Sequence, residues 1–406
     1  MRVLFTTNPV LGHFLPLVPL AHALQSVGHT VAFAAPSLAA VGRSFEQDVN
    51  AAGFVLLPVG SPDYLQTDPG WQEVWQFVAT RPDPRDLHRF GLTRLFPEIA
   101  PRAILSDVAD VCDRWRPELI VSDNLEYAGR VAGESRSIPH ATIAVDSSVR
   151  YADRRAIVPQ MDCLRASVGL PPDPDGEMQF RYLHLVNAPV ELLADDELPP
   201  TGVRLRRSIR DGDGLPDWVA TLPRRQTVYA TAGTFVSRFP GVLERLLEAM
   251  ANEPVNLILT VGPDTDPASL GVPPPNVHVE RYIPQSRLMP YCDAVLAHGG
   301  TGTVYTALEH GLPLVNVPIG ADQFVTSESC ANAGVGLVIG PEQRNPDAIR
   351  AAVREVLADS AYREKARQLQ RAIHALPTPA DVVPLLERLA AEKRPIVRSA
   401  LQVHRT

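Results

Sequence analysis

The chain has 406 residues, of which 45% are hydrophobic and 21% charged, and this composition is typical of a globular protein long enough for two domains. Its formal net charge is -8 and its Lys and Arg residues are dispersed, which argues against nucleic acid as a partner. No apolar run approaches the roughly 18 residues of a membrane span, and four scattered cysteines predict reduced thiols in a cytoplasmic protein.

The first half of the chain alternates between short apolar runs and amphipathic segments. The predicted strands cover residues 3–7, 30–35, 54–59, 119–122 and 141–145, and the predicted helices cover 16–27, 107–116 and 125–136. Because the first strand starts so early, we expect no signal peptide. Alternating strands and helices are typical of a doubly wound parallel sheet, in which ligands lie beyond the carboxyl ends of the strands.

Irregular stretches at 61–84 and 151–177 interrupt this alternation, and a third, between 198 and 223, contains an Asp-Gly turn and flanking prolines that predict a linker. Beyond it, strands are predicted at 227–231, 255–261, 293–297 and 314–317, and helices at 242–251, 347–358 and 362–375. We therefore predict an α/β fold of two Rossmann-like doubly wound domains that face a central cleft. The predicted parts are a first domain at 1–203, a linker at 204–222, a second domain at 223–379, and a C-terminal helix and tail at 380–406 that can pack back on the first domain.

A histidine and an aspartate follow two predicted strands of the first domain. His13 comes after the first strand, just before a helix that Pro16 starts, and Asp123 ends the strand at 119–122. An imidazole titrates near neutral pH and can take a proton from a hydroxyl, while a carboxylate on its other nitrogen would fix the tautomer and stabilise the imidazolium. The alternative is that His13 and Asp123 merely cap helices.

The most informative motif is a Gly-rich turn at 298–303 between a predicted strand and a predicted helix. The first N–H groups of a helix are unpaired and favour an anionic phosphate, and a histidine adds a side-chain donor. We expect a diphosphate site there, with a further hydroxyl from the end of strand 227–231; two ordinary turns are the alternative. The residues of this predicted site are His298, Gly300, Thr301, Gly302, Thr303 and Thr234.

Two further motifs of the second domain favour a nucleotide sugar. Asp322 and Gln323 lie at another strand–helix junction, where an acid and an amide can bind vicinal hydroxyls; a helix N-cap is the alternative for Asp322. Tyr282 can stack on a nucleobase whose edge meets the backbone of Ile283, although a half-buried tyrosine near a turn is common.

Metal sites have little support in the sequence. Acidic pairs at Asp211 and Asp213, and at Asp264 and Asp266, lie in Gly- and Pro-rich loops, where solvated turns are the simpler interpretation. There is no His-Glu-x-x-His motif, and no Gly-x-Ser-x-Gly motif for hydrolysis by a serine. We expect no metal.

Together these motifs resemble the GT-B glycosyltransferases of the bacterial natural-product branch of the UDP-glycosyltransferase-like family, which modify polyketide, enediyne and related aglycones. The resemblance covers essentially the whole chain, in the family's order. It is carried by Gly12-His13-x-x-Pro16, Asp123, Tyr282-Ile283-Pro284-Gln285, the turn at 298–303, Gly311-Leu312-Pro313 and Asp322-Gln323.

The resemblance implies an inverting, metal-independent transfer of a sugar to a hydroxyl of a hydrophobic acceptor, with no cofactor. His13 would be the catalytic base with Asp123 as its partner, in an acceptor-binding first domain, and the second domain would bind the donor as described above. The acceptor would lie against the irregular segments of the first domain, which we expect to be mobile before binding. The side chains predicted to contact it are Trp71, Trp75, Phe77, Tyr151 and Met161.

One position departs from the UDP-using members of the family. These members carry a Glu eight residues after the phosphate histidine, where it binds the ribose hydroxyls; here that residue is Thr306, and Glu309 comes three residues later. A donor without a ribose 2′-hydroxyl does not need this carboxylate, so a dTDP-linked deoxysugar is favoured. A UDP-sugar is the alternative, because a threonine can still bind one hydroxyl.

The expected partners are a dTDP-sugar and a small-molecule aglycone, with a homodimer left open. Two other functions are weaker alternatives. A nucleotide-sugar 2-epimerase shares the fold but lacks the Gly-His-x-x-Pro base with its aspartate, and a non-catalytic nucleotide-sugar binder would keep the turn at 298–303 without needing His13.

Overall fold

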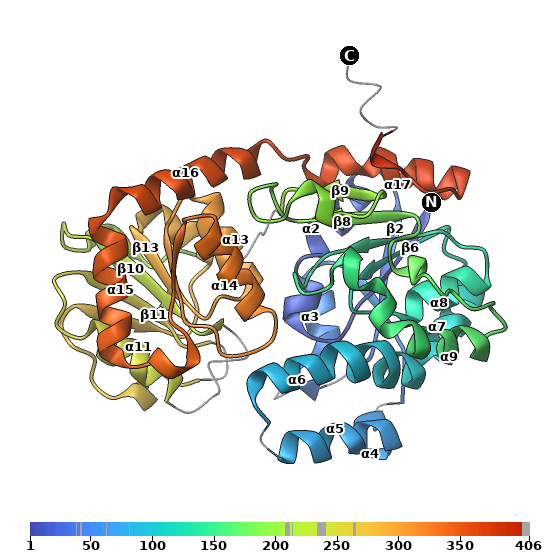
Figure 1. Cartoon of the computed structure of the whole chain (residues 1–406), viewed down its shortest axis with the longest axis horizontal. Helices are drawn as coiled ribbons and strands as arrows, with labels where there is room; N and C mark the ends of the chain where they lie inside the picture. Colours follow the sequence, from blue (N-terminus) through green and yellow to red (C-terminus); the bar gives the residue numbers. More distant parts are fainter. Residues whose placement is uncertain are drawn as a thin grey trace. The chain divides into compact units, whose positions relative to one another are not determined.

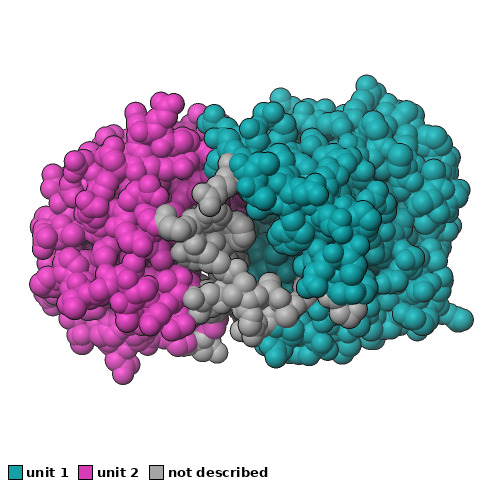
Figure 2. Space-filling model, turned by 90° about the horizontal axis from the view of Figure 1, so that it is seen from below, with its two compact units in different colours: residues 1–208, 376–406 teal, residues 209–375 magenta. Residues whose placement is uncertain are grey.

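A computed structural model describes residues 1–37, 39–40, 43–61, 63–80, 82–207, 212, 214–233, 241–262 and 265–399. The chain divides into two compact units, residues 1–208 with 376–406 and residues 209–375 (Figure 2). Thr234, which is part of the predicted diphosphate site, lies outside the described residues, as do Asp211, Asp213 and Asp264. In the described part of the chain, no helix has the length and apolar character needed to cross a membrane.

The first unit is built on a seven-stranded, all-parallel sheet in the order β5-β2-β1-β6-β7-β8-β9 (Figure 1). Its strands are β1 (Arg2–Thr6), β2 (Thr30–Ala35), β5 (Val55–Pro58), β6 (Leu119–Asp123), β7 (His140–Ile143), β8 (Leu183–Val186) and β9 (Gly202–Arg204); β3 (Ala39–Ala40) and β4 (Arg43–Ser44) form a separate hairpin. The strand order reverses between β1 and β6, so the first unit has its switch point there.

Helices of the first unit fill the connections between these strands. They are α1 (Leu11–Phe14), α2 (Val18–Ser26), α3 (Phe45–Ala51), α4 (Tyr64–Thr67), α5 (Pro69–Ala79), α6 (Pro84–Phe90), a π-helix (Gly91–Ile99), α7 (Ala100–Trp115), α8 (Ala128–Ser135) and α9 (Val158–Ser167). Short 3₁₀ turns at Tyr151–Ile157 and Glu177–Phe180 flank α9.

The last helix, α17 (Pro379–Glu392), belongs to the first unit although it follows the second in sequence. Thr378 and Asp381 form a capping box at its start, and Lys393 ends it in the left-handed conformation. Its buried side chains Val382 and Leu386 join the core beneath β1 and β2, and α17 packs along α2 (Figure 1). The predicted return of the C-terminal helix to the first domain is therefore confirmed.

The second unit is a six-stranded parallel sheet in the order β12-β11-β10-β13-β14-β15, which reverses between β10 and β13 (Figure 1). Its strands are β10 (Thr227–Thr231), β11 (Asn256–Thr260), β12 (Val277–Glu280), β13 (Ala294–Ala297), β14 (Leu314–Asn316) and β15 (Gly336–Val338). Its helices are α11 (Val242–Met250), α12 (Gln285–Leu288), α13 (Thr301–Glu309), α14 (Gln323–Asn332), α15 (Pro346–Ala358) and α16 (Ser360–His374). Together the two sheets confirm the predicted fold class.

Several elements differ from the sequence prediction. Strands β8, β9, β12 and β15 were not predicted, because each has only three or four residues and contains a histidine or a glycine that shortens its apolar run. The residues predicted as irregular at 61–84 contain α5, where Asp68 accepts hydrogen bonds from the N–H groups of Gly70 and Trp71. The Asp-Pro pair there is a helix start rather than a loop, since proline is favoured in the first helical turn. The stretch at 151–177 likewise contains α9.

Candidate active site

The first candidate centre lies where the strand order of the first sheet reverses. His13 belongs to α1, the short helix after β1, and Asp123 is the last residue of the neighbouring strand β6. His13 Nδ1 lies 3.2 Å from Asp123 Oδ2; the His13 side chain is 15% exposed and that of Asp123 is fully buried. The imidazole thus faces the carboxylate with Nδ1.

The Asp123 carboxylate is held by neutral donors as well as by His13. Oδ2 accepts hydrogen bonds from Thr7 Oγ1 and the Asn8 N–H, both at 2.9 Å, and Oδ1 accepts one from the Leu125 N–H at 2.8 Å. Burial alone would raise the pKa of Asp123, but His13 and these backbone donors outweigh it and lower the pKa. Asp123 is therefore ionised at neutral pH and is fixed in position.

Residues that the sequence analysis did not identify surround this pair. The ring of Phe96 lies 5.7 Å from the imidazole. Asn124, next to Asp123, joins β6 to the loop after β7: its Nδ2 donates to the Asp146 carbonyl at 3.0 Å and its Oδ1 accepts from the Val145 N–H at 3.0 Å. Asparagine after an aspartate at a strand end is a weak signal, and no periodic pattern points to Phe96.

The second candidate centre lies at the corresponding point of the second sheet, where β10 and β13 are neighbours. His298 follows β13, and Gly233, two residues after β10, has a φ of 72°. A Cβ on Gly233 would lie 2.6 Å from the His298 ring, and one on Gly300 would overlap Nε2. Glycine is therefore required at both positions for the backbone to pass so close to the imidazole.

The His298 ring is neutral at neutral pH. Burial lowers its pKa to about 4, although a hydrogen bond to the Thr231 backbone partly opposes the shift. Its Nδ1 is buried and has no hydrogen-bond partner among the residues that the structure describes. A buried ring nitrogen without a partner costs free energy, so a ligand that satisfies it would be favoured there.

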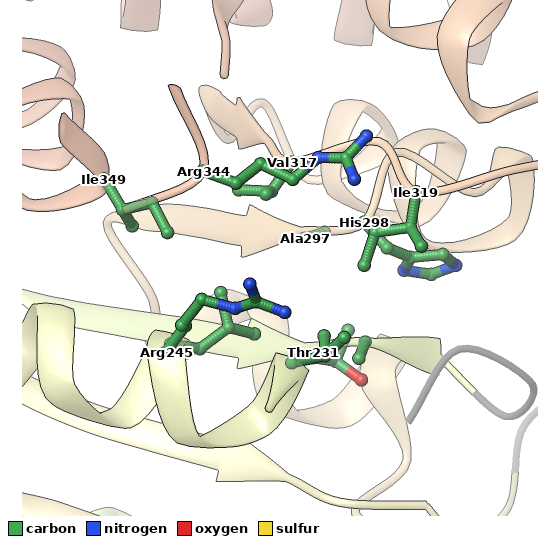
Figure 3. A pocket seen from close by; sticks show the side chains of 11 residues that line it. Thr231, Arg245, Ala297, His298, Val317, Ile319, Arg344 and Ile349 are labelled. Atoms are coloured by element: carbon green, nitrogen blue, oxygen red, sulfur yellow. The ribbon is translucent and has the colours of Figure 1, made fainter. Parts of the chain in front are cut away.

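A cavity of about 210 Å³ lies beside this histidine at the carboxyl ends of β10 and β13. Its walls are mostly apolar, from α11, α15 and β14, but it also has two arginines. Figure 3 shows the guanidinium groups of Arg245, from α11, and Arg344, from the segment before α15, on either side of the cavity, with His298 at one end. The arginines were not predicted, because neither belongs to a local motif.

The start of α13 combines free backbone donors with fixed hydroxyls. Gly300 is its N-cap and provides no side-chain cap. Thr301 Oγ1 donates to Asp322 Oδ2, and Thr303 Oγ1 accepts from Gln285 Nε2 at 3.2 Å. Gly302, between the two threonines, accepts a bond at its carbonyl from Thr306 Oγ1 at 2.9 Å. The threonine side chains at the helix start are thus held by hydrogen bonds, while no side chain among the described residues caps the backbone N–H groups that point along the helix axis.

The two residues predicted to bind the sugar lie at the start of α14. Asp322 stands at the N-cap position but makes no side-chain cap bond, so its carboxylate is bound by Thr301 instead. Gln323 Oε1 accepts from the N–H groups of Ile319 and Gly320 at 2.8 and 3.0 Å, which fixes the loop after β14. The structure brings Asp322 next to the predicted diphosphate helix.

The predicted nucleobase residues differ sharply in exposure. Tyr282, in the loop before α12, is 55% exposed, whereas Ile283 is buried. An exposed ring next to a buried residue is suited to stacking, and it differs from the half-buried tyrosine that was the alternative.

The five side chains predicted to contact the acceptor are divided among three environments. Trp71 and Trp75, both on α5, have ring centroids 6.1 Å apart, and Phe77 stacks on Phe90 at 4.4 Å. Tyr151 Oη donates to Glu177 at 3.1 Å. Met161 is buried in the core beneath α7 and α8, where it offers no surface to a ligand.

The chain is similar to known proteins over most of its length. Models of the erythromycin biosynthesis protein CIII-like family match the chain, the N-terminal domain at residues 22–233 and the C-terminal domain at 244–389. Elloramycin glycosyltransferase ElmGT of Streptomyces olivaceus is 31% identical, covering 94% of this chain and 96% of its own. The 3-alpha-mycarosylerythronolide B desosaminyl transferase of Saccharopolyspora erythraea is 28% identical over 97% and 99% of the two chains.

Among solved structures, the glycosyltransferase VinC in complex with dTDP superimposes with a TM-score of 0.77 at 25% identity and covers 97% of this chain and 100% of its own. The resemblance of the sequence motifs to natural-product glycosyltransferases is therefore confirmed. Because the two family models together span most of the chain, the protein belongs to the erythromycin biosynthesis protein CIII-like family and is a glycosyltransferase.

Proposed function

We propose that the protein transfers a deoxysugar from a dTDP-sugar to a hydroxyl of a hydrophobic natural-product aglycone, with inversion at the anomeric carbon and without a metal. The observation that carries the proposal is the His13–Asp123 pair at 3.2 Å, at the switch point of the first sheet. A general base needs a buried, ionised partner for its half-buried imidazole. A protein that only binds a nucleotide sugar would not need such a partner.

In the proposed reaction, the acceptor hydroxyl lies between His13 Nε2 and the anomeric carbon of the donor. Its oxygen forms the new bond to that carbon as the bond to the β-phosphate oxygen breaks on the opposite face. The hydroxyl proton passes to Nε2, and Asp123 stabilises the resulting imidazolium through Nδ1.

The leaving dTDP gains negative charge on its β-phosphate, and the second unit supplies positive charge for it. The unpaired N–H groups at the start of α13 carry the positive end of the helix dipole. The neutral His298 would lie against the phosphate with its buried ring, and Arg245 and Arg344 add full charges beside it. Donors that are already in place where charge develops usually contribute more to such catalysis than any other single effect.

The environment of Thr306 supports dTDP over UDP. Thr306 is buried in α13, and its hydroxyl already donates to the Gly302 carbonyl at 2.9 Å. Thr306 therefore offers a ribose 2′-hydroxyl no carboxylate and no hydroxyl proton. VinC, whose structure contains dTDP, is consistent with this choice.

The remaining donor residues have supporting positions in the second unit. Tyr282 would stack on the thymine and Ile283 would contact its edge through the backbone, while Asp322 and Gln323 would bind the sugar hydroxyls. Trp75 on α5, whose ring is exposed, would contact the acceptor.

Calorimetric titration and product analysis together test this function. We expect dTDP to bind more tightly than UDP, a dTDP-deoxysugar to be consumed only when an aglycone is present, and NMR to show the opposite anomeric configuration in the product. Activity that persists in excess EDTA would support metal independence. Tighter binding of UDP would refute the donor assignment, and retention of configuration would refute the role of His13.

A further inference from the structure

The side-chain amide of Gln285 connects the two loops assigned above to the nucleobase and to the diphosphate. Gln285 begins α12, and its Nε2 donates to Tyr229 Oη at 3.1 Å and to Thr303 Oγ1 at 3.2 Å. Both of these hydroxyl groups belong to buried residues. Because a hydroxyl can donate as well as accept, the amide can bridge the two groups in either of its orientations.

Each end of this bridge is attached to a rigid element. Tyr229 lies in the central strand β10, and its Oη is 2.8 Å from Thr260 Oγ1 on the adjacent strand β11. Thr303 is the third residue of α13, so its own N–H is among the unpaired donors of the helix start. A shift of the helix start would therefore break the bond to Gln285, which lies three residues after Tyr282.

The other side of the helix start is held by the sugar loop. Thr301 and Thr303 are two residues apart, so their side chains leave α13 about 200° from each other. Thr301 Oγ1 donates to Asp322, while Thr303 Oγ1 accepts from Gln285. The helix start is thus fastened on one side to the loop before α14 and on the other to the loop that carries Tyr282.

We propose that Gln285 is a positioning residue that holds the nucleobase loop and the diphosphate helix in register. The two parts of a nucleoside diphosphate are then bound together more tightly than the separate parts predict, because Gln285 removes the freedom of one loop relative to the other. This inference rests on the proposed function, since it takes a nucleoside diphosphate as the ligand. Gln285 acts through Tyr229 and Thr303.

The test compares dTDP with inorganic pyrophosphate, which has only the diphosphate, by calorimetric titration of the full chain. Gln285→Met keeps the side-chain length but cannot bridge two hydroxyls. We expect it to weaken dTDP binding about fivefold, the effect of one neutral hydrogen bond, and to leave pyrophosphate binding unchanged.

Variants of Thr303 separate this role from direct contact between Gln285 and the nucleotide. Thr303→Val keeps the backbone N–H and the side-chain shape but loses the hydroxyl, so it should reproduce the loss, and Thr303→Ser should restore affinity. The double variant of Gln285→Met and Thr303→Val should bind dTDP no more weakly than either single variant.

A matched control is available at the other end of α13. Gln370 Nε2 donates to the Glu309 carbonyl at 3.0 Å, so Gln370→Met removes the same kind of bond and should leave both affinities unchanged. Equal losses for dTDP and pyrophosphate, or normal dTDP binding by Thr303→Val, would overturn the proposal. A wild-type chain that binds pyrophosphate but discriminates against dTDP would overturn the proposed function as well.

Discussion

The two sheets reverse their strand order in the same way. The polar side chains at the two reversal points nevertheless differ in charge and in whether their polar atoms already have hydrogen-bond partners. At the end of β6, Asp123 is ionised, and its two oxygens have partners from the loop after β1, from α1 and from its own loop. After β13, His298 is neutral, and its Nδ1 has no partner among the described residues. The Asp123 carboxylate is satisfied within the protein, whereas a ligand would satisfy His298 Nδ1.

Under the proposed function, this difference corresponds to separate contributions to the reaction. A base must be oriented before the acceptor arrives, and the buried network around Asp123 provides that orientation. A phosphate site instead benefits from donors that remain unpaired until the anion binds. Variants of the first centre should therefore change turnover, and variants of the second should change donor affinity.

The largest effect is expected from His13→Ala. Turnover should fall by about 10² to 10⁴, the usual contribution of a positioned general base, while the affinity for dTDP stays nearly intact. Steady-state rates and calorimetric titration of the same preparation measure both quantities. Normal turnover would remove His13 as the base, and loss of dTDP binding would contradict the separation of the two centres.

Asp123→Asn should give a smaller loss of turnover than His13→Ala, because it removes the charge that supports the imidazolium. Both carboxylate oxygens accept hydrogen bonds, so the new NH₂ group must face a donor and should destabilise the fold by about 1–3 kcal/mol. Since His13 and Asp123 act as a unit, the double variant should be little slower than His13→Ala. Multiplicative losses would show that they act independently.

For the second centre, His298→Ala should weaken dTDP binding about 10- to 100-fold, since a hydrogen bond to a charged group contributes about 1.5–3 kcal/mol. Asp322→Ala should weaken dTDP binding less than His298→Ala does, because it only releases the Thr301 hydroxyl at the helix start, and it should weaken binding of the sugar-bearing donor more. Titrations with dTDP and with a dTDP-sugar separate these outcomes. Equal loss of dTDP affinity in both variants would contradict the assignment of separate diphosphate and sugar groups.

A third histidine, His184, also lacks a carboxylate partner among the described residues, and its lowered pKa should make the stability of the fold depend on pH. His184 on β8 is buried and bonded to Thr142 Oγ1 at 2.6 Å, and burial together with the charge of Arg130 lowers its pKa to about 3. The unfolded chain, with a pKa of about 6.5, binds more protons between these values, so stability is lost as pH falls. From pH 7 to pH 5 we expect wild type to lose about 2 kcal/mol relative to His184→Gln. Urea unfolding of both full chains at the two pH values measures this difference, and a constant difference would contradict it.

The smallest effect is expected at Thr306. Thr306→Glu places a carboxylate where UDP-using relatives of this fold would have it, so the preference for dTDP over UDP should narrow by about threefold to tenfold. Thr306→Gln, of similar size but without charge, should narrow it less. Calorimetry measures the affinities for dTDP and UDP in each variant. An unchanged ratio of the two affinities in Thr306→Glu would mean that this position does not contact the ribose.

The parts of the molecule that follow from sequence are those in which function and local pattern coincide. His13, Asp123 and the turn at 298–303 each follow an apolar run long enough to be recognised as a strand, and parallel strands deliver their carboxyl ends to one edge. The short strands β8, β9, β12 and β15 were not recognised, because a histidine or a glycine in each of them shortens the apolar run.

Contacts between distant segments could not be predicted from the sequence for a different reason. Gln285 was part of a recognised motif, but its bonds to Tyr229 and Thr303 depend on how α12 packs against β10 and α13. Arg245 and Arg344 meet at one cavity although about a hundred residues separate them in the chain. Met161, by contrast, was assigned to the acceptor by its chemical character, and its burial in the core was not visible in the sequence.

The return of α17 to the first unit has a consequence for synthesis of the protein on the ribosome. The second unit is continuous in sequence, from 209 to 375, and has all of its residues before α17 emerges. The first unit must wait, because Val382 and Leu386 complete the core that contains Leu20 and Leu24 of α2. We therefore expect the domain that is translated first to reach its native state last, with an apolar face of α2 open to chaperones until translation ends.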